Sequence, residues 1–164
     1  MRFSKIKDND IANGEGIVMS LWTQGCPHHC KGCFNLETWD FDGGKEFKEE
    51  DKEYILQNID KNNIKRNLSI LGGEPLCNQN IQGVISLCKA FKEKYPNKTL
   101  WSWSGYTFDN DLKDKEVVKY LDVLVDGQYK DELSNPTLKW RGSENQRVIN
   151  VQESLKDSNI VLFN

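Results

Sequence analysis

Three cysteines stand within eight residues of one another, at Cys26, Cys30 and Cys33. The segment also contains a proline and a glycine, which predict a loop able to wrap one small object. Converging thiolates suit a soft metal centre, and most iron–sulfur clusters take four cysteine ligands. Three thiolates would hold a four-iron cluster by three irons and keep the fourth open for a substrate or cofactor. The loop follows directly on a buried strand expected at residues 17–22, which is where α/β folds place their cofactor sites.

A structural zinc site is the alternative for these thiols. His28 and His29 lie inside the loop, and zinc binds three cysteines and one histidine in a tetrahedron. Zinc motifs usually draw their ligands as two separated pairs, and no second pair follows here. We expect the two histidines to lie near the cluster without binding it, and Cys77 and Cys88 to be buried apolar residues. Five cysteines, an odd number, also argue against a disulfide framework.

Length and charge limit the class of protein. The 164 residues fit a single domain, 1–164, with a core of ordinary size. A net charge of −3 without a basic tract does not suggest nucleic-acid binding. No apolar run approaches a membrane span and no signal peptide is recognisable, so we expect a protein of the reducing cytoplasm. We expect most of the five tryptophans in the core and one or two beside a ligand or a partner surface. They are Trp22, Trp39, Trp101, Trp103 and Trp140.

Short apolar runs alternate with amphipathic segments along the chain. Strands are expected at 17–22, 68–71, 99–103, 123–125, 147–150 and 160–163. Helices are expected at 47–59, 80–95 and 111–120. Residues 1–15 are interpreted as an irregular lead-in, 36–45 as a loop, and 128–146 as a long polar connection of a kind that is usually functional or mobile. The alternation predicts an α/β fold with mostly parallel strands, and a closed barrel needs about 250 residues, so we expect an open partial (β/α) barrel.

The cysteine loop, with the Phe34-Asn35 that follows it, resembles the cluster loop of the radical S-adenosylmethionine (SAM) enzymes. The later Gly72-Gly73-Glu74-Pro75 makes the resemblance closer. Within that family the chain is similar, from residue 13 to residue 143, to the glycyl-radical activases of the anaerobic ribonucleoside-triphosphate reductase. The resemblance implies a radical SAM partial barrel that holds one [4Fe–4S] cluster through Cys26, Cys30 and Cys33 and binds SAM at the open iron.

The same resemblance implies the reaction and its partners. Reductive cleavage of SAM would give an adenosyl radical that takes a hydrogen atom from one glycine of the large reductase subunit. A one-electron donor such as flavodoxin or ferredoxin would reduce the cluster. Two other functions stay open: a radical SAM synthase acting on a small metabolite, which a compact closed pocket would favour, and a zinc-binding interaction module. An exposed cluster face would favour the activase.

Gly72, Gly73 and Glu74 fit the task of positioning SAM. Glycines let a ligand approach the backbone, and carbonyl oxygens and the Glu74 carboxylate can accept hydrogen bonds from the SAM ammonium. A plain strand-to-helix turn is the alternative. The segment 141–147 is similar to a family segment near the C-terminus, which implies a surface that meets the reductase; a solvated polar loop is the alternative.

The remaining cofactor-binding candidates are placed less directly. Gly32 stands where many radical SAM enzymes have an aromatic residue, and Phe34 follows Cys33 instead of preceding it. Phe34 could stack on the adenine or pack in the core under the loop. Ser102 and Ser104, like Asp126, lie at expected strand ends, from which ribose or carboxylate contacts would come.

Overall fold

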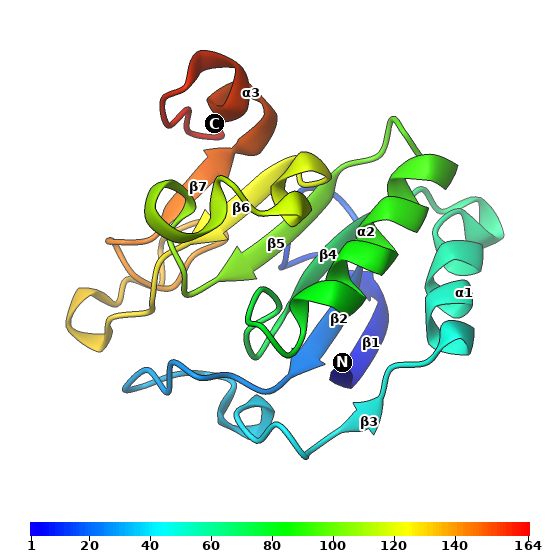
Figure 1. The fold of residues 1–164 in the computed structure, drawn as a ribbon, viewed down its shortest axis with the longest axis horizontal. Helices are drawn as coiled ribbons and strands as arrows, with labels where there is room; N and C mark the ends of the chain where they lie inside the picture. Colours follow the sequence, from blue (N-terminus) through cyan, green and yellow to red (C-terminus); the bar gives the residue numbers. More distant parts are fainter.

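The computed structural model describes all residues, 1–164, and is built on one seven-stranded sheet (Figure 1). The strand order is β3-β1-β2-β4-β5-β6-β7. The strands are β1 (Arg2–Asp10), β2 (Val18–Gln24), β3 (Lys45–Glu46), β4 (Asn67–Gly72), β5 (Leu100–Ser104), β6 (Val123–Asp126) and β7 (Arg147–Asn150). The central β2, β4, β5 and β6 are parallel, whereas β1, β3 and β7 join antiparallel. The expected α/β class is therefore confirmed, as a mixed open sheet; curvature into a partial barrel stays a prediction.

Two of the expected helices cover one face of this sheet. They are α1 (Glu49–Asn58) and α2 (Ile81–Lys94), which lie side by side in Figure 1. Alternate residues of each strand point toward them because side chains alternate between the two faces of a strand. Met19, Leu21, Ile70, Leu100 and Leu124 meet the helices in this way and are fully buried. No helix of the structure is long and apolar enough to cross a membrane.

Loops cover the opposite face of the sheet. Trp22, Leu71 and Trp103 lie on that face, together with the small Ser20 and Ser69. The covering segments are the turn after β1 and the long connection between β6 and β7. Because loops pack less completely than helices, this face retains an open space at the ends of the strands.

The expected irregular lead-in is wrong, because residues 2–10 form β1. Its residues pair antiparallel with β2, with Ile6 opposite Leu21 and Lys5 opposite Trp22. The ammonium groups of Lys5 and Lys7 lie 4.3 and 5.0 Å from the Trp22 ring centroid. Charged residues on a half-exposed strand interrupt its run of apolar residues, so a search for apolar runs does not find β1.

Two other expectations need correction, and one helix was not expected. The helix expected at 111–120 is a π-helical turn, Phe108–Leu112, followed by a 3-10 turn, Glu116–Lys119. The segment 160–163 makes one isolated bridge, Ile149 to Leu162, instead of a strand. The sequence reading also missed the short helix α3 (Val151–Asp157), which begins where the Asn150 side chain accepts a hydrogen bond from Glu153 N. Residues 36–45 are mostly loop as expected, although β3 begins at their end.

Candidate functional site

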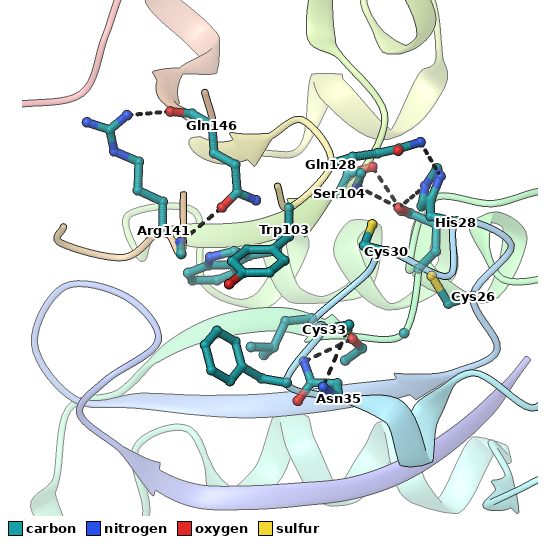
Figure 2. Close-up of a pocket in the computed structure, with 18 of the residues that line it drawn as sticks. Cys26, His28, Cys30, Cys33, Asn35, Trp103, Ser104, Gln128, Arg141 and Gln146 are labelled. Carbon is teal, nitrogen blue, oxygen red and sulfur yellow. Dashed lines mark hydrogen bonds and ion pairs between the residues drawn. The ribbon is translucent and has the colours of Figure 1, made fainter. Parts of the chain in front are cut away.

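A cavity of about 400 Å³ opens beside the C-terminal ends of β2, β4 and β5, on the face that loops cover (Figure 2). All three clustered cysteines line it. Four of the five tryptophans line it as well: Trp22, Trp39, Trp103 and Trp140. The expectation that most tryptophans pack in the core is therefore wrong, and Trp101 alone is fully buried. A wall of thiols and aromatic rings suits a soft metal centre beside a ligand with a flat, partly apolar group.

The cysteine loop is closed at its base by two backbone hydrogen bonds. Gly25 N donates to Thr38 O at 2.7 Å, and Cys26 N donates to Trp39 O at 3.1 Å. Between these closures, Cys33 N donates to Cys30 O at 3.1 Å. These backbone contacts thus hold the three cysteines around one space (Figure 2).

One further contact is directed at a thiol. Asn35 N donates to Cys33 Sγ at 3.4 Å, and the Asn35 side chain donates to Gly72 O at 3.4 Å. Backbone N–H groups directed at cysteine sulfurs are a common way of tuning iron–sulfur clusters. Asn35 therefore joins the site, a role that its place directly after the third cysteine and Phe34 could have signalled.

Burial raises the pKa of two of the thiols and so favours their protonated form. It raises the pKa of Cys26 to about 11, with Glu74 and Cys30 adding to the rise through their charge. Burial, followed by the charge of Cys33, also raises the pKa of Cys30. Because metals bind the thiolate form, cluster binding must release these protons.

The two histidines do not compete for a metal. The ring nitrogens of His28 are both engaged, Nε2 with Glu74 Oε2 at 2.8 Å and Nδ1 with the Gln128 amide at 3.1 Å. His29 stacks on Trp39, with ring centroids 4.6 Å apart. No three His, Cys, Asp or Glu side chains lie close enough together to hold one metal ion. A cluster does not need that arrangement, because each cysteine binds a different iron.

Gly72 and Gly73 are required by the backbone packing around them. Gly72 has φ +112°, and a Cβ there would lie 2.6 Å from Thr23 N. Gly73 N donates to Thr23 O at 2.9 Å, and Glu74 N donates to Gly25 O at 2.8 Å. The segment is therefore joined both to the end of β2 and to the start of the cysteine loop, and all three of its residues line the cavity.

Substitution of Gly73 by alanine should destabilise the protein even without SAM. The new Cβ would lie 2.5 Å from Gly25 O and 2.8 Å from Thr38 O, both backbone atoms of the loop closure. We expect the free energy of unfolding to fall by about 3 kcal/mol. Urea denaturation measures it, with Gly16→Ala as the control, because a Cβ at Gly16 meets nothing within 4 Å and adds only the strain of φ +73°. Equal losses in the two variants would contradict the packing argument.

The other cofactor candidates separate into those inside and those outside the cavity. Phe34 lines it, is 77% exposed and contacts the Tyr129 ring, so packing in the core under the loop is wrong for it. Gly32 does not line the cavity; its φ of +75° serves a turn facing Asp131. Ser104 lines the cavity, and its hydroxyl contacts Glu74 Oε1 at 2.9 Å.

Ser102 lies outside the cavity. It follows Trp101 and precedes Trp103, and it points to the face that the helices cover, where its hydroxyl donates to Ile70 O at 3.0 Å. Ser102 lies on the same face of β5 as Ser104 but two residues deeper in the strand, so it is covered before the cavity begins at the strand end. Asp126 does not line the cavity either. It is 1% exposed, and its carboxylate accepts hydrogen bonds from Arg147 and from Phe108 N.

The long connection 128–146 forms one wall of the cavity. Its two halves pair with each other, with Asn135 N donating to Gly142 O at 3.1 Å and Glu144 N donating to Leu133 O at 2.9 Å. Trp140 joins it to the rest of the molecule, because its indole N–H donates to Gly14 O at 3.0 Å. Its own carbonyl accepts from the Trp103 indole at 2.7 Å. These bonds hold the turn after β1, the end of β5 and the connection together around the cavity.

Arg141 and Arg147 have different places. Arg141 lines the cavity and donates to Glu144 O at 3.1 Å within its own loop. Arg147 belongs to β7 and forms ion pairs with Asp126 and Asp109 across the sheet edge. The part of this segment that can meet a partner is therefore the Arg141 side, while Arg147 is committed to the fold.

Two comparisons identify the class of protein to which this fold and site belong. A family model described as a 4Fe-4S single cluster domain matches residues 12–149, which include the sheet core and all three loop cysteines. The match places the chain in the class of iron–sulfur proteins with one cluster. It argues against the alternative of a zinc-binding module.

Curated relatives narrow the class to one family. Proteins named anaerobic ribonucleoside-triphosphate reductase-activating protein match from Pasteurella multocida (38% identity, 89% of this chain and 95% of the relative) and from Vibrio cholerae (37%, 89% and 96%). The protein of that name from Enterobacteria phage T4 is 38% identical over 90% of this chain and 93% of its own length. The chain belongs to the family of anaerobic ribonucleoside-triphosphate reductase-activating proteins.

Proposed function

We propose that the whole chain, as a single domain 1–164, is a radical SAM activating enzyme of the anaerobic ribonucleoside-triphosphate reductase. Cys26, Cys30 and Cys33 hold one [4Fe–4S] cluster, and SAM binds beside it against Gly72, Gly73 and Phe34. The observation that carries the proposal is that the three thiols and the Gly72–Glu74 segment line one cavity. Its volume of about 400 Å³ lies in the range of small-molecule sites.

The chain's own residues would bind and orient both groups. When bound together, the cluster and SAM supply a one-electron reduction that produces a radical able to take a hydrogen atom from a glycine. The Gly73 carbonyl accepts no hydrogen bond within the chain and is free to accept one from the SAM ammonium. The tryptophan side chains exclude water from the far wall of the cavity, which protects a reactive intermediate from side reactions.

The exposed edge of the cavity favours a protein substrate over a small metabolite. Phe34 is 77% exposed and Leu36 is 59% exposed, and both belong to the cysteine loop. A metabolite enzyme would be expected to enclose such residues, whereas a partner chain would cover them. The glycine of the large reductase subunit reaches the site from this side, and a flavodoxin- or ferredoxin-type donor supplies the electron in the cytoplasm.

One preparation tests this function through its iron content, its binding of SAM and the radical that it generates on the reductase. Protein purified and reconstituted anaerobically should contain about four irons and four sulfides per chain. Its reduced-cluster spectrum should change when SAM is added. Mixed with the reductase, it should generate an organic radical on the reductase, with hyperfine splitting from one glycine α-hydrogen. The proposal would be contradicted if the protein contained zinc and took up no iron. It would also be contradicted if a small molecule were turned over and no radical formed on the reductase.

A further inference from the structure

The Glu74 side chain is buried and fully occupied. It is 1% exposed, although it carries a carboxylate at the wall of the cavity. Oε1 accepts from Leu76 N at 2.9 Å and from the Ser104 hydroxyl at 2.9 Å. Oε2 accepts from Gly105 N at 2.7 Å and contacts His28 Nε2 at 2.8 Å. Figure 2 shows His28 and Ser104 meeting at this point, one from the cysteine loop and one from the end of β5.

All four partners of Glu74 are donors. The two backbone N–H groups can only donate. The Ser104 oxygen already accepts from Tyr106 N at 3.1 Å, so its hydrogen is directed at the carboxylate. The Gln128 amide nitrogen can only donate to His28 Nδ1, so Nδ1 carries no hydrogen and the ring hydrogen lies on Nε2. His28 therefore donates to Glu74 as well.

This set of donors leaves the carboxylate no room for a ligand. A carboxylate offers about four lone-pair sites, and the four donors fill them. An ammonium from SAM would have to displace one of these donors from a site that water does not reach. The Gly73 carbonyl, which lines the same cavity, has no such competitor.

We infer that Glu74 is a positioning residue, which ties the cysteine loop to the end of β5, and that its side chain is not a ligand of SAM. The inference rests on the proposed cluster at the three cysteines. Through His28, Glu74 fixes the middle of the loop between Cys26 and Cys30. Through Ser104 and Gly105, it fixes that loop relative to the opposite wall of the cavity. The position of the cysteine loop relative to the end of β5 therefore depends on one buried carboxylate.

Two variants and their combination test this role in the cluster-loaded protein. Glu74→Gln keeps the shape but turns one acceptor atom into an N–H group that faces two donors. His28→Leu removes the donor on the loop. Each should release iron to a ferrous chelator about tenfold faster than the unmodified protein, since a hydrogen bond to a charged group is lost. The double variant should be no faster than the worse single one, because both act through one contact.

SAM affinity distinguishes a SAM ligand from a positioning residue, because only the loss of a ligand would weaken it strongly. The dissociation constant of SAM in loaded Glu74→Gln should stay within about threefold of the unmodified value. The matched control is Asp10→Asn, which alters a carboxylate that is also buried, at 5% exposure. It too accepts four hydrogen bonds, from Ala12 N, Asn13 N, the Asn13 amide and the Ser20 hydroxyl, but none from the cysteine loop. Asp10→Asn should not accelerate iron release.

Three results would overturn the inference. One is a loss of SAM affinity of about tenfold or more in Glu74→Gln with normal affinity in His28→Leu. Another is iron release from Asp10→Asn as fast as from Glu74→Gln, which would reduce the effect to general destabilisation. The third is unchanged iron release in His28→Leu, a result that stands even if Glu74→Gln fails to fold. Failure of the proposed function is distinct, because it would appear as an unmodified protein that takes up no cluster.

Discussion

Alanine at Cys26, Cys30 or Cys33 should leave the protein with almost no iron after anaerobic reconstitution. Each of the three lines the cavity, and the loop offers no other thiol to replace a lost ligand. A cluster held by two thiolates is not retained, so iron should fall from about four atoms per chain to near zero. Iron and sulfide analysis, together with the visible absorption of the cluster, measures the loss.

The remaining cysteines give the control. Cys77 and Cys88 lie outside the cavity and are buried, as expected from the sequence. Burial raises the pKa of Cys77, and it raises that of Cys88 within α2 to about 12, which makes both poor metal ligands. Cys77→Ala and Cys88→Ala should therefore keep the full iron content. Iron lost from either control, or kept by any variant of the loop cysteines, would contradict the assignment.

Arg147→Met should lower the free energy of unfolding by about 3 kcal/mol, because it leaves the buried Asp126 carboxylate without its cation. Arg147 Nε lies 3.0 Å from Asp126 Oδ1, and Asp126 is 1% exposed. Arg141→Met is the matched control, with an expected loss of about 1 kcal/mol, since that guanidinium contacts only carbonyl oxygens of its own loop. Urea denaturation of both variants measures the difference.

The second ion pair of Arg147, with Asp109, makes the stability depend on pH in acid. The hydrogen bond from Arg147 holds the pKa of Asp109 below its usual value of 3.8. A carboxyl with a lowered pKa contributes stability above its unfolded value and loses that contribution as the pH falls through the folded value. Below pH 3.8 the gap between the unmodified protein and Arg147→Met should therefore narrow. A gap that is constant or grows in acid would contradict a role for the Asp109 contact.

The sequence predicted the parallel centre of the fold because its strands are largely buried on both faces and are therefore rich in apolar residues. β2, β4, β5 and β6 were all located by runs of such residues, and α1 and α2 by their spacing. β1 was missed because one of its faces carries lysines over Trp22. Residues 111–120 were interpreted as one helix because the pattern does not reveal that a π-helical turn ends at Leu112 and a separate 3-10 turn begins at Glu116.

The candidate site was predictable where the chemistry is local. The cysteine spacing and the Gly-Gly-Glu-Pro segment mark two loops that do meet in one cavity. The sequence could not show that the Glu74 carboxylate is fully hydrogen-bonded. Only the folded chain brings together its donors, which come from His28, Leu76, Ser104 and Gly105. The hydrogen bond from the Trp140 indole to Gly14 O joins residues far apart in the sequence and was not predictable for the same reason.

The two hydrogen bonds that close the base of the cysteine loop bear on when a cluster can be inserted. Gly25 and Cys26 are fixed to Thr38 and Trp39 by the backbone alone, and the sheet beneath them has its own apolar core. Small zinc domains fold only when their metal arrives. For this chain we expect the sheet and the closed loop to form first, since neither contact involves a cysteine side chain. Iron delivery is then expected to be a late maturation step on a folded scaffold.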